Sequence, residues 1–221
     1  AGRAYPLDNV DIIYVLLVLS TALILYFLLS VARRRHKKQI HYVVLGLTAS
    51  ILIWNIAILF YPLAAHVPWA LTLCAQFYFL GTIFASLSVL FTGLIFARTK
   101  IKFTWKHGLL FVVPAVSIAV LFTNQSHHLF YTTFSLIPSI QRFGIYFTIH
   151  TIYSYLCIGV GMAYLVAVSI KNYGIFSRQS LLIFIGILIS LIIDAISTFK
   201  IFDWSTAIEN IAFAVTISLF I

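Results

Sequence analysis

The sequence predicts an all-α membrane protein, a bundle of seven transmembrane helices with the N-terminus outside and the C-terminus inside. Of its 221 residues, 62% are hydrophobic and only 9% are charged, whereas a soluble domain is about 45–50% apolar and about 25% charged. A soluble core of this size could not bury so much apolar surface. The apolar residues also form continuous runs close to the roughly 20 residues that a helix needs to cross a bilayer. Strands of a membrane barrel would instead alternate every second residue.

Seven apolar segments are expected to be helices. They cover about residues 10–31, 40–61, 69–96, 108–122, 144–170, 180–199 and 207–221. The fourth segment contains Pro114, which has no N–H to donate and should kink that helix. We expect residues 1–221 to form a single seven-transmembrane domain. Because the seventh segment is still apolar at Ile221, we expect the natural protein to continue into a further domain that this chain lacks.

The orientation follows from the Lys and Arg residues that flank the segments, since cytoplasmic loops carry an excess of them. Eleven lie in the loops after segments one, three and five: Arg33, Arg34, Arg35, Lys37, Lys38, Arg98, Lys100, Lys102, Lys106, Lys171 and Arg178. Three lie on the other side: Arg3, Arg142 and Lys200. The charges therefore mark the inner face and contact with lipid headgroups. We predict no nucleic-acid partner, since no fold here would carry one.

The outer connection over residues 123–143 is long and too apolar for a free loop. It carries one charge, Arg142, together with His127, His128 and several aromatic residues. We expect it to fold back onto the bundle as a short helix or hairpin, because such a patch is rarely left exposed to water.

The strongly polar residues inside the apolar segments share one depth, the outer third. They are Asp11, Asn55, Gln76, His150, Asp194, Glu209 and Asn210. Polar residues in hydrocarbon are costly and often functional, and a transporter would place them near the midplane. Hydrogen bonding between helices is the favoured interpretation for Asn55, Gln76 and Asn210. A ligand pocket is favoured for Asp194 and Glu209, with His150 or Lys200 as a possible partner.

We expect no metal and no cofactor. Adjacent His127 and His128 rarely share one ion, and no pair of histidines has the spacing of a helical metal site. Cys74 and Cys157 lie in apolar runs and are expected to be buried free thiols. The seventh segment has no Lys for a retinal Schiff base, which excludes a rhodopsin-like function.

The order of these features resembles the seven-transmembrane N-terminal sensor region of membrane histidine kinases. The motifs are Pro114-Ala115-Val116 leading to Leu121-Phe122-Thr123-Asn124, then His127-His128-Leu129-Phe130-Tyr131, and Asp203-Trp204-Ser205-Thr206-Ala207 before the last segment. The outside N-terminus and the basic first inner loop are also similar. The sequence departs from the family pattern at Asp194, in a segment that is usually uncharged and often carries a proline.

The resemblance implies an input module, not an enzyme in itself, that detects an extracellular or outer-leaflet small-molecule or lipid-like signal and relays it through the seventh helix. It implies a homodimer in the plasma membrane of a prokaryote, with membrane lipids as further partners. The predicted ligand-binding residues are Asn55, Gln76, His127, His150, Asp194, Asp203 and Glu209. Two alternatives remain open: a small transporter or channel, and an intramembrane lipid-modifying enzyme that uses Asp194, Glu209 and His150.

Overall fold

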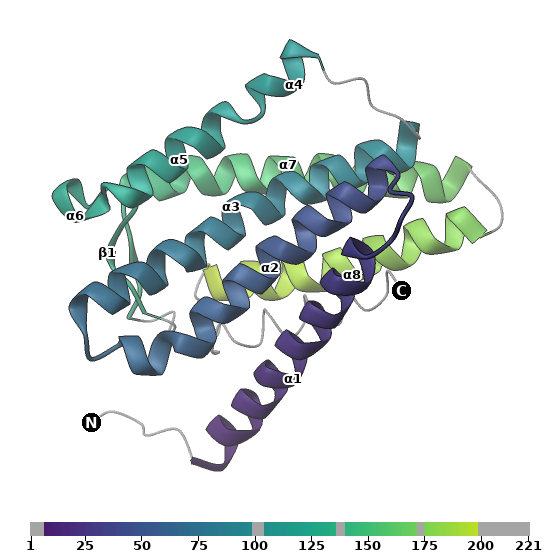
Figure 1. Cartoon of the computed structure of the whole chain (residues 1–221). Coiled ribbons are helices and arrows are strands. Elements are labelled where there is room, and N and C mark those ends of the chain that lie inside the picture. Colours follow the sequence, from purple (N-terminus) through teal and green to yellow (C-terminus); the bar gives the residue numbers. More distant parts are fainter. Residues whose placement is uncertain (1–6, 99–103, 136–139, 172–174, 199–221) are drawn as a thin grey trace.

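The computed structural model describes residues 7–98, 104–135, 140–171 and 175–198, and most of these are helical (Figure 1). The long helices are α1 (Leu7–Ala32), α2 (Gln39–Ala64), α3 (Pro68–Arg98), α7 (Ile145–Lys171) and α8 (Ile175–Thr198). Shorter helices are α4 (Trp105–Leu109), α5 (Val112–Phe122) and α6 (Asn124–His127), and the strands are β1 (Tyr131–Thr133) and β2 (Arg142–Phe143). The first six predicted segments are thus helical, with bounds that differ by a few residues from those expected.

Four described helices are long and apolar enough to cross a membrane. They cover Tyr14–Ala32, Gln39–Ala64, Pro68–Ala97 and Ile145–Lys171, while His107–Phe122 and Ser180–Ile196 are shorter apolar helical stretches. The predicted seventh helix, over residues 207–221, lies outside the described residues. The all-helical membrane architecture is therefore supported, and the number of spans stays a prediction.

The helix α3 lies at the centre of the bundle. It packs along α2 on one side and α7 on the other, while α8 packs on α7 and α1 packs on α2 (Figure 1). The chain passes close to itself where α3 meets α7: a Cβ added to Gly161 would lie 2.6 Å from the carbonyl oxygen of Val89. Only glycine permits this approach of two helix backbones.

The fourth apolar segment is broken rather than smoothly kinked. Helix α4 ends at Leu109 and α5 begins at Val112, so the interruption comes just before Pro114. Proline cannot donate to the carbonyl four residues earlier, which here belongs to Leu110. The hydroxyl of Tyr153 on α7 donates to that carbonyl instead, so the break is tied to the bundle.

The segment after α5 was expected to be a short helix or a hairpin, and it contains both. Helix α6 is followed by β1, which pairs antiparallel with β2. The side chain of Asn124 shapes the turn: its Nδ2 donates to the carbonyl of Tyr131 at 2.8 Å, and its Oδ1 accepts from the backbone N–H groups of Phe130 (2.8 Å) and Tyr131 (3.2 Å). Phe130, Tyr131 and Phe134 are buried in an aromatic cluster with Phe79 of α3.

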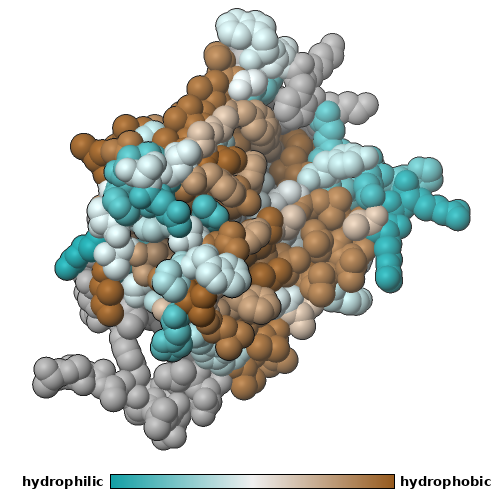
Figure 2. Space-filling view, turned by 60° about the vertical axis from the view of Figure 1, so that its left-hand side comes forward, coloured by the Kyte–Doolittle hydropathy of each residue, from teal (hydrophilic) through white to brown (hydrophobic). Residues whose placement is uncertain are grey.

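On the face shown in Figure 2, hydrophobic residues cover much of the surface, and hydrophilic ones gather in separate patches. Large apolar side chains face outward along α1 and α7, among them Leu19, Ile149 and Leu156. In water such a surface would drive aggregation, whereas in lipid it costs nothing. The exposed surface therefore agrees with the apolar composition.

Candidate functional site

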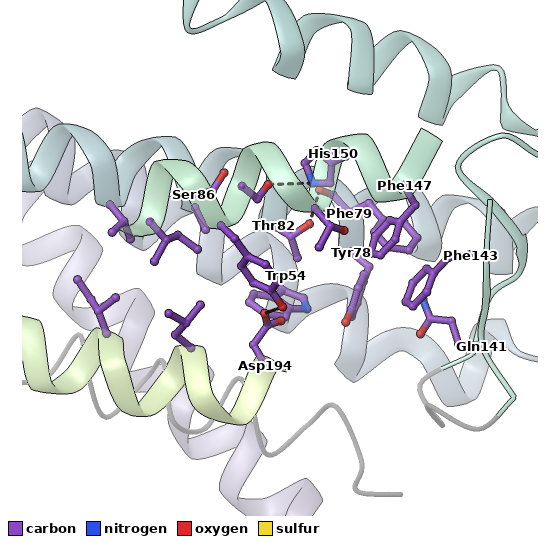
Figure 3. Close-up of a pocket in the computed structure, with 18 residues that line it drawn as sticks. Trp54, Tyr78, Phe79, Thr82, Ser86, Gln141, Phe143, Phe147, His150 and Asp194 are labelled. Carbon is purple, nitrogen blue, oxygen red and sulfur yellow. Dashed lines mark hydrogen bonds between the residues drawn. The ribbon is translucent and has the colours of Figure 1, made fainter. Parts of the chain in front are cut away.

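A cavity of about 90 Å³ lies among α2, α3, α7 and α8, next to the end of the hairpin (Figure 3). Its polar lining comes mainly from α3 and α7, with one residue from α8. These polar residues are Thr82, Ser86, Gln141, His150, Thr151, Ser154, Tyr155 and Asp194. The hairpin end of the bundle is the end opposite the basic α1–α2 loop (Figure 1), so the cavity belongs to that half of the molecule.

His150 is held on α7 by polar groups from two helices. Its Nδ1 lies 3.3 Å from the hydroxyl of Ser117 on α5, and its Nε2 lies 3.3 Å from the hydroxyl of Ser154, one turn further along α7. The imidazole ring lies 5.5 Å, between centroids, from the ring of Phe130 at the start of the hairpin. The side chain is almost fully buried, so it joins α5, α7 and the hairpin beside the cavity.

Asp194 enters the cavity from α8 (Figure 3). Its Oδ2 accepts a hydrogen bond of 3.0 Å from the hydroxyl of Tyr155 on α7. The carboxyl group therefore faces the bundle and not the lipid, where an ionised carboxylate would be costly. Because α7 and α8 are antiparallel neighbours, this bond links the two helices near the hairpin end.

Aromatic rings form much of the remaining wall. They are Trp54 from α2, Tyr78 and Phe79 from α3, Phe143 from β2 and Phe147 from α7. Trp54 and Tyr78 are in edge-to-face contact, with centroids 5.6 Å apart and planes at 86°. The cavity thus combines flat apolar walls with a few fixed polar groups, which is the usual composition of a small-molecule site.

The structure brings together two of the seven predicted site residues, His150 and Asp194. Asn55 is buried away from the cavity lining, where its Nδ2 donates to the hydroxyls of Ser20 (3.3 Å) and Thr21 (3.4 Å) on α1. This contact is the helix-packing bond that the sequence favoured for Asn55.

Of the four remaining predicted residues, the structure describes Gln76 and His127. Gln76 is partly buried on α3 and does not line the cavity. His127 supports its own turn, with Nε2 2.9 Å from the Thr123 hydroxyl and Nδ1 accepting from the N–H of Leu129 at 3.0 Å. Asp203 and Glu209 lie outside the described residues, so the predicted pairing of Asp194 with Glu209 stays a prediction.

Sequence reasoning missed Tyr155, Trp54 and Gln141 in the lining. A signal for Tyr155 was present: His150 and Thr151 are each followed four residues later by another polar side chain, Ser154 and Tyr155. That spacing places all four on one face of a helix. Trp54 and Gln141 carry no such signal, since only the packing of α2 and the hairpin brings them to α7.

The described residues hold no group of three His, Cys, Asp or Glu side chains that could bind a metal ion. Cys74 and Cys157 are free and buried, as expected. The chemistry on offer at the cavity is therefore hydrogen bonding, a carboxyl group and aromatic surface.

A family model described as the N-terminal 7TM region of histidine kinase matches residues 13–221. No curated protein matches the chain significantly. The family match covers nearly the whole length, including the predicted seventh segment. The chain therefore belongs to the family of N-terminal seven-transmembrane regions of histidine kinases.

Proposed function

We propose that this chain is the sensor module of a membrane histidine kinase, and that the cavity lined by His150 and Asp194 receives an extracellular or outer-leaflet small molecule. The observation that supports it most is the cavity itself. Polar groups from three helices, α3, α7 and α8, meet there with aromatic walls, in the half of the bundle that the charge distribution assigns to the outside.

In this proposal the chain crosses the plasma membrane seven times, with the N-terminus outside. Asp194 lies near the end of α8, a few residues before the predicted seventh helix. A ligand that changes the contact of Asp194 with Tyr155 would shift α8 against α7 and so alter the start of the seventh helix. That helix would carry the change to a dimeric kinase inside the cell.

The mechanism is a shift between two helix arrangements. A ligand changes the populations only if it binds one arrangement more tightly than the other. The bond between Tyr155 and Asp194 stabilises one relative position of α7 and α8. A ligand group that replaces this hydrogen bond favours another position of the two helices. The activity of the kinase then changes with that position.

The test uses the complete protein that carries this chain, expressed in cells. Asp194→Asn keeps the shape of the side chain but removes its charge and changes its bond with Tyr155. We expect the phosphorylated fraction of the protein to change several-fold, because the equilibrium between helix arrangements is biased. Membrane insertion and protein level should stay as in the wild type.

Ser190→Ala is the matched control, since Ser190 lies one turn earlier on α8 and its hydroxyl donates to the carbonyl of Gly186 at 3.0 Å within that helix. It should leave phosphorylation unchanged. If Asp194→Asn and Ser190→Ala give the same phosphorylated fraction as the wild type, the cavity does not control the output. If the complete protein is never phosphorylated with ATP, the kinase assignment itself is wrong.

A further inference from the structure

We propose that the cavity binds a small organic ammonium ion, with its charged nitrogen at Asp194 and its apolar part against the aromatic walls. This inference rests on the proposed function and adds the class of ligand. It follows from the charge of the described lining, the hydrogen-bond acceptors of the carboxyl group, the aromatic surface and the size of the cavity.

The charge of the described lining favours a cationic ligand. Among the described residues that line the cavity, Asp194 is the sole acidic one, and none is Lys or Arg. A charge in a medium of low dielectric constant interacts strongly with an opposite charge nearby. Asp194 is partly buried, and a carboxylate withdrawn from water is costly without a cation nearby. A cationic ligand would supply the positive charge that the described lining lacks.

The carboxyl group of Asp194 offers hydrogen-bond acceptors to a ligand with N–H donors. An ionised carboxylate has two oxygens that together accept about four hydrogen bonds. Among the described residues, Tyr155 donates one such bond, to Oδ2. An ammonium group has several N–H donors for further acceptor positions, and hydrogen bonds between charged groups are roughly twice as strong as neutral ones.

The aromatic surface of the cavity also favours a cation. The faces of aromatic rings carry a negative electrostatic potential that attracts cations, most strongly for Trp. Trp54 and Tyr78 both line the cavity and are in edge-to-face contact with each other. Aromatic rings beside a carboxylate are suited to an ammonium ion and to the carbon atoms next to it.

The size of the cavity favours a small ligand. Its volume of about 90 Å³ is smaller than the roughly 150 Å³ of an apolar cavity that holds benzene. The ligand, or the part of it that enters, is therefore a compact group of a few heavy atoms. An anion of that size would be repelled by Asp194, and a neutral molecule would bring no counter-ion to the carboxylate.

The test measures binding to the complete protein in nanodiscs of zwitterionic lipid, with empty nanodiscs as the blank. Three probes of similar shape differ in charge: isobutylammonium, isobutanol and isobutyrate. By calorimetry at neutral pH we expect isobutylammonium to bind at least tenfold more tightly than isobutanol, and isobutyrate not to bind. Asp194→Asn should weaken the binding of isobutylammonium by about tenfold or more, the factor typical of a hydrogen bond between charged groups. It should leave the affinity for isobutanol nearly unchanged.

Ser190→Ala should bind all three probes as the wild type does, since this residue does not line the cavity. Equal binding of isobutylammonium and isobutanol would overturn the inference while leaving a ligand site for neutral molecules. Binding of isobutylammonium that survives in Asp194→Asn, or no binding of any probe, would also overturn it. None of these outcomes decides the proposed function, because that is read from phosphorylation of the variants without any probe.

Discussion

The buried polar side chains of this bundle have different structural roles, which follow from their hydrogen-bond partners. Asn55 bonds two hydroxyls of α1 and joins α1 to α2. Asn124 bonds three backbone groups and shapes the hairpin. His150 lies at the cavity, between two serine hydroxyls. Substitutions at these positions should therefore affect different properties.

Asn55→Ala should cost little stability and leave phosphorylation of the complete protein unchanged. Hydrogen bonds between membrane helices contribute about 0.6 kcal/mol each on average, and Asn55 makes two long ones. Unfolding in mixed micelles measures the loss, which should be about 1 kcal/mol. A large change in phosphorylation would mean that the contact of α1 with α2 belongs to the signalling mechanism.

Asn124→Ala should loosen the hairpin while the long helices stay folded. It leaves buried backbone groups of Phe130 and Tyr131 without partners, at about 1–3 kcal/mol each. Amide hydrogen exchange in nanodiscs should become faster over residues 130–135 and 142–146. The control is Gln125→Ala, since the exposed Gln125 makes one contact, with Thr72. Unchanged exchange in Asn124→Ala would show that aromatic packing alone orders the hairpin.

The position of each polar residue along its helix could be read from the sequence, but the direction of each side chain could not. Asn55, His150 and Asp194 were all assigned to the outer third, and two of them reach the cavity. The rotation of α2 turns Asn55 toward α1. That rotation is set by packing against neighbouring helices, which the order of residues along one segment does not specify.

At the scale of elements, the apolar runs predicted six helices well and predicted their irregularities less well. The second helix was expected to end at residue 61, yet α2 continues to Ala64 with Pro62 inside it. A proline near a helix end loses one hydrogen bond, and neighbouring groups in a membrane protein can offset that loss. The break before Pro114 is offset in a similar way by the Tyr153 hydroxyl.

The contact between α3 and α7 should depend on glycine. In Gly161→Ala the new Cβ would lie 2.6 Å from the Val89 carbonyl oxygen, so the helices must separate, at a cost of about 1–3 kcal/mol. Gly159→Ala on the same helix meets nothing within 4 Å and should be neutral or slightly stabilising, because alanine favours helix. Thermal unfolding in detergent compares the two variants, and equal midpoints would contradict the close approach.

At the scale of the whole molecule, the basic α1–α2 loop and the hairpin strands lie at opposite ends of the bundle (Figure 1). The charge rule then predicts that the hairpin end faces outward. Family membership agrees with a sensor region. The lining of the cavity depends on how four helices and the hairpin meet. The sequence alone could not bring that set of residues together.

The orientation can be tested with an impermeant thiol reagent on intact cells. Ser126→Cys, in the turn after α5, should be labelled, and Lys37→Cys, in the basic loop, should not. The two native cysteines are buried, so the background should be low. After the membrane is permeabilised, both engineered cysteines should react. The opposite pattern in intact cells would reverse the topology.

The central claim is that the state of the cavity sets the activity of the kinase. Thr151 lines the cavity, whereas Ile152, the next residue of α7, faces outward. Thr151→Phe should fill part of the cavity and act as a fixed ligand, and Ile152→Phe should only alter the lipid-facing surface. In the complete protein in nanodiscs, we expect Thr151→Phe to change the basal autophosphorylation rate several-fold and Ile152→Phe to leave it as in the wild type. Equal rates in all three folded proteins would contradict the account.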